Sequence, residues 1–267
     1  YSIVGHTIRV KMETYIVIDF IKESVGYLGY DFKGDVLNAV SYGVPQARER
    51  YILIGIKREL RKDEIKLPKP IIDNPLNYIT VKEAIKDLEA IEPTVEGMDE
   101  TQKRTHCPLI DSYYRKLVMI DNYKDVHNHV CTATRETALQ RFEQIAPGKN
   151  FHSLPDELKS SYENPGRTQN TVYKRLDPNR PSDTVVNVRK SMWIHPVFNR
   201  AVSAREAARL QSFPDDYIFY GTKDSVYQQI GNAVPPVLGR AVAETVLELF
   251  GITKKAYLSL EEIYKSV

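Results

Sequence analysis

The sequence has few cysteines, no long apolar run and little net charge. Its two cysteines, Cys107 and Cys131, cannot form a metal site alone and give no disulfide framework, which favours a reducing compartment. No apolar segment approaches the roughly 18 residues of a membrane span, and the first residues show no signal-peptide pattern. A net charge of +2 neither requires nor excludes nucleic acid, because the distribution of the basic residues decides that point.

What is present indicates a folded protein. Of the 267 residues, 42% are hydrophobic and 27% charged, which is typical of a soluble globular chain with a sizeable core. The chain begins with Tyr1 and not with methionine, so we expect a fragment, a processed product or a chain with a leader. It contains no internal repeat and no low-complexity segment.

In the first third of the chain, hydrophobic spacing predicts a helix over 13–28 that ends at Gly29. A strand is expected over 35–40 and a more buried strand over 50–56. The capping box formed by Thr80 and Glu83 predicts a helix that runs to about residue 90. From there to about residue 171 the periodicity is weak, which indicates a loop-rich insert.

Near the C-terminus, Ser203 and Glu206 form a second capping box, followed by an amphipathic helix with Arg205 and Arg209 on one side. This helix needs no ligand and is expected to be a scaffold element. A double proline, 235–236, opens a long apolar helix that Gly251 closes, and a short capped helix follows over 259–262.

The segment 41–55 (SYGVPQARERYILIG) places Gln46, Arg48 and Arg50 at alternate positions directly before an apolar strand. Because strand side chains alternate between faces, these three are expected to point the same way and to line a polar pocket. Arginine offers a planar set of donors that suits phosphate or a base oxygen. Taken alone, the pattern also fits the solvated edge of a strand.

A second polar group lies in 228–244 (QQIGNAVPPVLGRAVAE), where Asn232 is expected in a Gly–Asn turn before the double proline. Free backbone amides at the helix start, beside the Asn232 amide, would form a cup for a carboxylate or another small polar ligand. An ordinary turn and helix N-terminus is the alternative.

Together, these segments resemble three motif blocks of DNA (cytosine-5) methyltransferases. Pro-Gln-x-Arg-x-Arg resembles the eighth block, Arg-Glu-Ala-Ala-Arg-Leu-Gln-x-Phe-Pro-Asp the ninth, and Gln-Ile-Gly-Asn-Ala-Val-Pro-Pro the tenth, in that order and at plausible spacings. The resemblance implies an α/β fold: the end of a Rossmann-like methyltransferase sheet, an irregular target-recognition lobe and C-terminal helices that return to the catalytic core. It divides the chain into 1–58 (core strands), 59–180 (target recognition) and 181–267 (ninth and tenth blocks).

The resemblance also implies roles for residues. Gln46, Arg48 and Arg50 match the catalytic eighth block beside the flipped-out cytosine, and Arg50 is expected to contact the base oxygen. The cofactor S-adenosyl-L-methionine is closed over by the tenth block, which corresponds to Gly231, Asn232, Ala233 and Val234. Arg175, Pro181 and Thr184 match residues that support the recognition region. The implied activity is C5 methylation of cytosine in DNA by a restriction-modification-type enzyme of the bacterial cytoplasm, associated with the nucleoid.

The chain departs from the family pattern because three motifs are absent from its 267 residues: the F-x-G-x-G cofactor loop, the Pro-Cys-Gln nucleophile loop and the Glu-Asn-Val strand. Cys107 precedes its proline and does not match the nucleophile, and Cys131 reads as a small buried residue. We therefore expect an N-terminal methyltransferase half or subunit that carries these motifs and binds most of the cofactor, and no activity from this chain alone. A non-catalytic DNA-binding or regulatory remnant is the alternative.

Double-stranded DNA is the expected partner of the loop-rich middle. Arg58 follows the second predicted strand, and five further basic residues are interleaved with Tyr113, Tyr114 and Tyr123: Lys103, Arg104, Arg115, Lys116 and Lys124. The basic side chains would neutralise phosphates while the aromatic rings contact bases. A solvated charged surface with exposed tyrosines is the alternative. The letters His127-Asn128-His129 spell a nuclease motif, but consecutive residues do not supply the dispersed ligands of a nuclease metal site.

Overall fold

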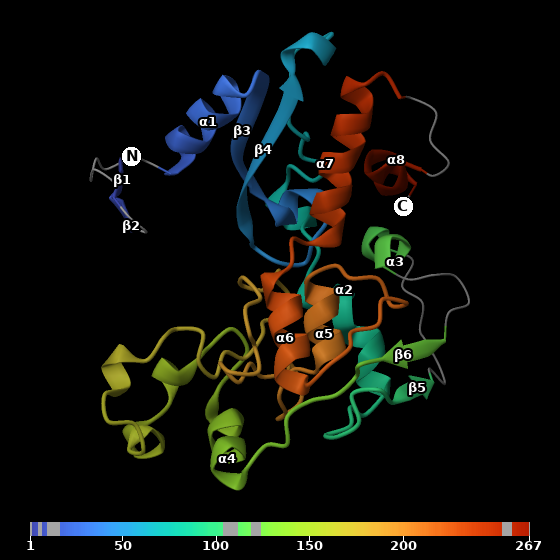
Figure 1. Cartoon of the computed structure of the whole chain (residues 1–267). Coiled ribbons are helices and arrows are strands. Elements are labelled where there is room, and N and C mark those ends of the chain that lie inside the picture. Colours follow the sequence, from blue (N-terminus) through green and yellow to red (C-terminus); the bar gives the residue numbers. More distant parts are fainter. Residues whose placement is uncertain are drawn as a thin grey trace.

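The computed structural model describes residues 2–4, 7–9, 17–103, 112–118, 124–252 and 258–266. Over these residues the protein is a mixed α/β chain in which helices and short strands alternate with long irregular segments (Figure 1). The described strands form three separate two-stranded antiparallel sheets, β1–β2, β3–β4 and β5–β6. None of the described helices is both long and apolar enough to cross a membrane.

The elements have the following bounds. The strands are β1 (Ser2–Val4), β2 (Thr7–Arg9), β3 (Tyr30–Asn38), β4 (Glu49–Lys57), β5 (Thr101–Lys103) and β6 (Asp125–His127). The α-helices are α1 (Val17–Tyr27), α2 (Val81–Ile85), α3 (Tyr113–Val118), α4 (Glu136–Gln144), α5 (Ala204–Leu210), α6 (Lys223–Asn232), α7 (Pro236–Leu249) and α8 (Leu260–Lys265). Short 3₁₀ helices cover Ala39–Tyr42, Arg58–Leu60, Pro75–Asn77, Lys86–Ala90, Phe151–Ser153, Asp156–Lys159 and Pro165–Arg167.

The longest strands, β3 and β4, pair along their whole length, from Tyr30 opposite Lys57 to Asn38 opposite Glu49. The strand predicted over 50–56 is confirmed as β4. The strand predicted over 35–40 was placed too late, because it begins at Tyr30 and ends at Asn38. There the Asn38 side chain accepts a hydrogen bond from the Val40 amide and caps a 3₁₀ helix, so the extended backbone stops.

Helices lie on both sides of the β3–β4 pair (Figure 1). On one face the buried side chains of Ile54 and Ile56 form a cluster with residues of α7. On the other face α1 approaches β3, and a Cβ at Gly26 would lie 3.7 Å from the Phe32 ring. The described part of the helix predicted over 13–28 is α1, and Gly29 follows it with a positive φ of 85°. Residues 13–16 lie outside the described residues.

The main core lies between α2, α3, α5, α6 and α8. Both predicted capping boxes are present, at Thr80 and Ser203, and the short helix predicted near 259–262 begins with a third capping box at Ser259. The prediction that α5 is amphipathic was wrong, because every residue from Ala204 to Leu210 is buried, including two arginines and a glutamate. The helix has no solvent-facing side, and its three charged side chains can be buried because each has polar partners inside the protein.

The C-terminal helices agree with the sequence only in part. The long helix opened by the double proline is confirmed as α7, and Gly251 follows it with φ 71°. Helix α6 was not predicted, since its polar, Gly- and Asn-ending sequence has little apolar periodicity.

The middle of the chain is irregular, as expected. Helix α4 and the 3₁₀ helices Phe151–Ser153 and Asp156–Lys159 contribute to one small apolar cluster that includes Phe142, Phe151 and Tyr173. This cluster is the core of the later part of the loop-rich region.

Candidate functional site

The alternation expected before β4 is present. Gln46 and Arg48 are buried, with 0% and 1% exposure, whereas Ala47 and Glu49 are exposed. Arg50, the second residue of β4, is half-buried. Two of the three side chains therefore enter the interior, and the third remains near the surface.

Gln46 joins segments that are distant in sequence. Its Nε2 donates to Oε1 of Gln211 (2.8 Å) and to the carbonyl oxygen of Leu210 (3.3 Å), and its Oε1 accepts from the Val185 amide (2.7 Å). Nε2 of Gln211 donates in turn to the carbonyl oxygen of Ile230 (2.8 Å). Both ends of the Gln46 amide are thus used within the protein.

Arg48 makes a second connection between the same segments. Its Nη1 donates to the carbonyl oxygen of Val185 (2.8 Å) and its Nη2 to that of Gly231 (2.9 Å), while its buried Nε has no hydrogen-bond partner among the residues that the structure describes. Burial, followed by the charge of Arg50, lowers the pKa of Arg48 to about 10. The guanidinium stays charged at neutral pH and is held by neutral carbonyl oxygens.

Arg50 differs from both. Its Nη1 donates to the carbonyl oxygen of the neighbouring Glu49 (2.6 Å), and the side chain is only half-buried. The structure therefore divides the three residues expected to line one pocket. Gln46 and Arg48 hold distant segments together, and Arg50 is the one of the three that lies within reach of a ligand.

The end of α6 corrects the expected Gly–Asn turn, because Gly231 and Asn232 are its last two residues. Gly231 is buried, and a Cβ there would lie 2.7 Å from the carbonyl carbon and oxygen of Val186, so this close approach requires glycine. Asn232 is exposed, and its Oδ1 accepts from Nε2 of Gln228 (2.8 Å). The helix thus presents Asn232 outward and packs Gly231 inward.

The start of α7 has few free backbone amides and so does not form the polar cup that was expected there. Pro235 and Pro236 have no backbone N–H, and the Val237 amide donates to Oγ of Ser212 (3.2 Å). The surface beside Asn232 is instead partly apolar, since Ala233 is half-buried and Val234 is 50% exposed.

Helix α5 carries a buried ionic group. Arg209 pairs with Asp215 (Nη2–Oδ2 2.7 Å) and with Asp87 (Nη2–Oδ2 3.1 Å), and its Nη1 donates to the carbonyl oxygen of Ala84 (2.8 Å). Burial would lower the pKa of Arg209, but the two carboxylates outweigh it and raise that pKa. The network connects α5 to α2, as expected of a scaffold element.

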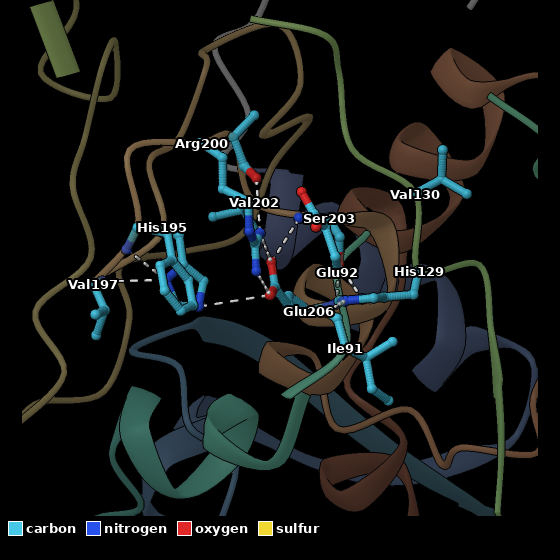
Figure 2. Close-up of polar contacts among 12 residues, drawn as sticks. Ile91, Glu92, His129, Val130, His195, Val197, Arg200, Val202, Ser203 and Glu206 are labelled. Carbon is cyan, nitrogen blue, oxygen red and sulfur yellow. Dashed lines mark hydrogen bonds and ion pairs between the residues drawn. The ribbon is translucent and has the colours of Figure 1, made fainter. Parts of the chain in front are cut away.

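A second buried network surrounds Glu206 (Figure 2). Arg200 donates to both carboxylate oxygens (2.6 and 2.9 Å), and Nε2 of His195 lies 3.6 Å from Oε1. Nδ1 of His195 accepts from the amides of Val197 and Phe198, which places its proton on Nε2, facing Glu206. Burial lowers the pKa of His195 to about 4.

His129 and Ser203 complete this network. Nε2 of His129 donates to the carbonyl oxygen of Ile91 (2.9 Å), so Nδ1 is the acceptor for the Ser203 hydroxyl (2.9 Å). Ser203 and His129 resemble a nucleophile and its base, but their exposures are 0% and 1%, and the Ser203 hydroxyl also caps α5. The arrangement stabilises the fold and gives no substrate access. Among the described residues, no group of histidine, cysteine and acidic side chains could hold a metal ion.

Arg175, expected to support the recognition region, is 4% exposed and donates to four backbone carbonyls, of Phe142, Ile145, His195 and Phe198, and to Oδ1 of Asn199. It joins α4 to the loop 195–199. Cys131 is buried, as expected, and burial raises the pKa of its thiol, which disfavours the reactive thiolate. Cys107 lies outside the described residues.

The basic residues expected to contact DNA are dispersed. Arg58 pairs with Asp31 (3.1 Å), Lys103 with Asp125, and Nζ of Lys116 donates to the carbonyl oxygen of Ser266 (3.1 Å). Lys124 is exposed and Arg115 half-buried, and Arg104 lies outside the described residues. Their contact with DNA stays a prediction.

The expectation that the interleaved tyrosines contact DNA bases is wrong for Tyr113 and Tyr114. Tyr113 and Tyr114 are core residues, with 4% and 1% exposure. Their hydroxyls donate to the carbonyl oxygens of Tyr42 and Arg209, so both rings are unavailable to stack on bases. Tyr123 lies outside the described residues.

Comparison with known proteins establishes which family this chain belongs to, because residues 10–248 match the model of the C-5 cytosine-specific DNA methylases. The chain belongs to that family. Among its relatives, the type II methyltransferase M.DdeI of Desulfomicrobium norvegicum is 35% identical over 257 residues, which cover 90% of this chain and 60% of the relative. The type II methyltransferase M1.HphI of Haemophilus parahaemolyticus is 33% identical, with coverages of 86% and 51%.

The fold is also that of a solved methyltransferase structure. A prophage-encoded protein assigned as a DNA modification methyltransferase (E. coli) superposes with a TM-score of 0.69 at 24% identity, covering 90% of this methylase chain and 67% of that chain. The family member described here thus spans about half to two thirds of the lengths of these proteins.

Proposed function

We propose that this family member supplies the C-terminal part, or a C-terminal subunit, of an enzyme that methylates cytosine at C5 in DNA. In this proposal the strand β4 and helices α5 to α7 belong to the catalytic core, and the irregular region between residues 59 and 180 recognises the target DNA. S-adenosyl-L-methionine is the methyl donor, as the family implies. The remaining part of the enzyme would contribute the F-x-G-x-G, Pro-Cys-Gln and Glu-Asn-Val motifs, which the 267 residues do not contain.

The observation that carries the proposal is the direct bonding between the three motif segments. Gln46 bonds to Gln211, Gln211 bonds to Ile230, and Arg48 bonds to Gly231. These contacts bring the Gln-x-Arg-x-Arg segment, the end of α5 and the end of α6 to one place. In these segments the Arg50 side chain is half-buried and the Asn232 side chain is exposed.

Arg50 is the residue to which we assign contact with the target base. A fixed guanidinium beside the base oxygen would stabilise negative charge that develops on the ring as the nucleophile adds. Gln46 and Arg48, being buried, would act by placing Arg50 and not by touching the base.

Asn232, Ala233 and Val234 fit one edge of a cofactor pocket. Asn232 offers an exposed amide, and the 50% exposed Val234 offers an apolar surface beside it. Gly231 would contribute indirectly, because its α-carbon packs on Val186 and its carbonyl oxygen accepts from Arg48. Most of the cofactor would be held by the part of the enzyme outside this chain.

Complementation tests the proposal. The chain would be mixed with an N-terminal methyltransferase segment that carries the three motifs, for example from M.DdeI, and transfer of a labelled methyl group to DNA would be measured. We expect transfer from the mixture and none from either part alone. If a folded partner gives no transfer while this chain still binds DNA, the alternative of a non-catalytic DNA-binding remnant is favoured instead.

A variant in the same assay tests the role of Arg50. Arg50→Ala is expected to abolish turnover while leaving DNA affinity within about threefold, because one lost transition-state contact can cost 10²–10³ in rate, roughly. The control is Lys33→Ala, which removes an exposed residue of β3 that pairs with Glu64. Wild-type rates in Arg50→Ala would remove the role assigned to it.

A further inference from the structure

Three side-chain amides form a chain of hydrogen bonds between a buried turn and the exposed end of α6. Nδ2 of Asn187 donates to Oε1 of Gln228 (3.2 Å), and Nε2 of Gln228 donates to Oδ1 of Asn232 (2.8 Å). Asn187 is 9% exposed, whereas the other two side chains lie at the surface. Gln228 thus uses both ends of its amide, and neither it nor Asn187 was among the residues expected to line the site.

The turn that carries Asn187 is anchored to the junction of the motif segments. Just before it, the carbonyl oxygen of Val185 accepts from Nη1 of Arg48 (2.8 Å). A Cβ at Gly231 would lie 2.7 Å from the backbone of Val186, so the turn and the end of α6 are in direct backbone contact. The side chain of Asn187 therefore has a fixed position relative to α6.

Helix α6 presents one face to this turn. Asp224, in its first turn, pairs with Arg189 (2.9 Å) and Lys190 (3.8 Å). Four residues later, Gln228 makes the second contact with the turn, and four residues after that comes Asn232. Residues spaced by four lie one above another on a helix, so Asn232 continues the face that the turn holds.

The chain of amides has a fixed direction. The Lys190 amide donates to Oδ1 of Asn187 (3.2 Å), a bond that it shares with the carbonyl oxygen of the same residue (3.1 Å). Because a backbone N–H can only donate, the Asn187 side chain turns its oxygen to Lys190 and its nitrogen to Gln228. Gln228 must then present Oε1 to Asn187 and Nε2 to Asn232. Asn232 consequently turns Oδ1 towards Gln228 and Nδ2 away from it, and this Nδ2 has no acceptor among the described residues.

We infer that Gln228 is a positioning residue of the cofactor site, which together with Asn187 turns the N–H donor of the Asn232 amide, and not its oxygen, towards S-adenosyl-L-methionine. The inference rests on the proposed function, because it takes Asn232 to line the cofactor pocket. It adds the chemical character of the contact. An unrestrained asparagine presents a donor or an acceptor equally well, whereas this one is set to donate to an oxygen or nitrogen acceptor of the cofactor.

Gln228→Glu reverses the direction of the chain with almost no change of shape. A carboxylate at 228 only accepts, so the Asn232 amide has to turn Nδ2 towards residue 228 and its oxygen outward. Cofactor binding is measured by titration calorimetry on the mixture of this chain with the complementary methyltransferase part. We expect Kd for S-adenosyl-L-methionine to rise about tenfold, because an acceptor replaces the donor at the contact. The rate at saturating cofactor should change by less than about twofold, since the change affects binding and not the chemical step.

A double-mutant cycle separates this effect from that of the added negative charge. Asn232→Ala is expected to weaken cofactor binding, and Gln228→Glu in the Asn232→Ala background should weaken it no further. A further loss of similar size in that background would overturn the inference.

The structural control is Ser225→Ala. It removes another exposed side-chain hydrogen bond of α6 with the same four-residue spacing, from Nε2 of Gln229 (3.2 Å), and the variant should bind the cofactor like the wild type. Equal losses in Ser225→Ala and Gln228→Glu would show that any disturbance of α6 weakens the site, and would overturn the inference.

Neutron diffraction from crystals of this chain tests the orientation without the cofactor, because deuterium marks the nitrogen of each amide. The deuterated nitrogen of Asn232 is expected to point away from residue 228 in the wild type and towards it in Gln228→Glu. The same orientation in both proteins would overturn the inference.

The two proposals fail differently. Methyl transfer by the mixture, with unchanged cofactor affinity in Gln228→Glu, would refute the positioning role and leave the proposed function standing. Weaker cofactor binding in Gln228→Glu without methyl transfer by the wild type would support the positioning role and count against the activity. A mixture that neither binds the cofactor nor transfers a methyl group would overturn both.

Discussion

Nε2 of Gln46 donates a hydrogen bond to Oε1 of Gln211, which lies 165 positions later in the chain, and the bond is completely buried. Because Gln211 donates onward to Ile230, two amide side chains connect the segment before β4 to the ends of α5 and α6. The relationship explains why an amide, with a donor and an acceptor at one end, stands at position 46.

Removing this amide should destabilise the protein. Gln46→Ala leaves the Val185 amide and one bond of Gln211 unsatisfied in the interior, for which we expect a loss of about 2–4 kcal/mol in the free energy of unfolding. Gln229→Ala, at an exposed glutamine of α6, should change it by less than about 0.5 kcal/mol. Urea denaturation measures both. A double-mutant cycle with Gln211→Ala should give a coupling of about 1 kcal/mol, and purely additive losses would contradict a direct interaction.

Two helical glycines should respond in opposite ways to alanine. Gly231→Ala would place a methyl group 2.7 Å from the Val186 backbone and is expected to destabilise the protein by about 1–3 kcal/mol. Gly239→Ala, in α7, meets nothing within 4 Å and should stabilise it by up to about 1 kcal/mol through helix propensity. Thermal unfolding distinguishes them, and a stabilising Gly231→Ala would mean that the contact with Val186 is loose.

Stability should fall in mild acid because of buried neutral histidines. The pKa of His195 is lowered by burial from 6.5 to about 4, and burial also lowers that of His129. Between pH 6.5 and 4 the unfolded chain binds a proton at His195 that the folded protein does not bind, so the stabilisation is complete above pH 6.5 and is lost as the pH falls. For His195 alone the loss is on the order of 3 kcal/mol.

Unfolding midpoints in urea, measured across this pH range, check the effect. His195→Asn keeps an acceptor for the Val197 and Phe198 amides but does not titrate, so the slope of stability against pH should decrease by about one proton. An unchanged slope in this variant would contradict the assignment to His195.

The ion pairs of Arg209 should be worth far more than an exposed pair. Arg209→Met leaves Asp215 and Asp87, whose side chains are 2% and 12% exposed, without their buried cation and should cost about 3–5 kcal/mol. Lys265→Met breaks an ion pair whose side chains are 70% and 67% exposed and should cost less than about 0.5 kcal/mol. Similar losses in the two variants, measured by denaturation, would show that burial does not amplify the Arg209 network.

Local sequence determined the elements that depend on neighbouring residues. Capping boxes at Thr80, Ser203 and Ser259 begin helices because a hydroxyl and a carboxylate three residues apart satisfy each other's backbone groups. The apolar run of β4 and the proline-opened α7 were equally local signals. The alternation that buries Gln46 and Arg48 and exposes Ala47 between them also followed from sequence alone, whereas the surface position of Arg50 did not.

The tertiary structure decided what those side chains do. Arg209, in a helix that seemed amphipathic by composition, is buried because Asp215, six residues later, and Asp87, 122 residues earlier, both pair with it, and no local pattern reveals the contact with Asp87. Tyr114 is likewise a core residue because its hydroxyl donates to the carbonyl oxygen of Arg209, which is distant in sequence. The sequence by itself determined the local elements and the motif blocks. The tertiary structure decided which side chains of the Gln-x-Arg-x-Arg segment are buried, because carbonyl groups from distant segments accept hydrogen bonds from Gln46 and Arg48 but not from Arg50, which stays half-buried near the surface.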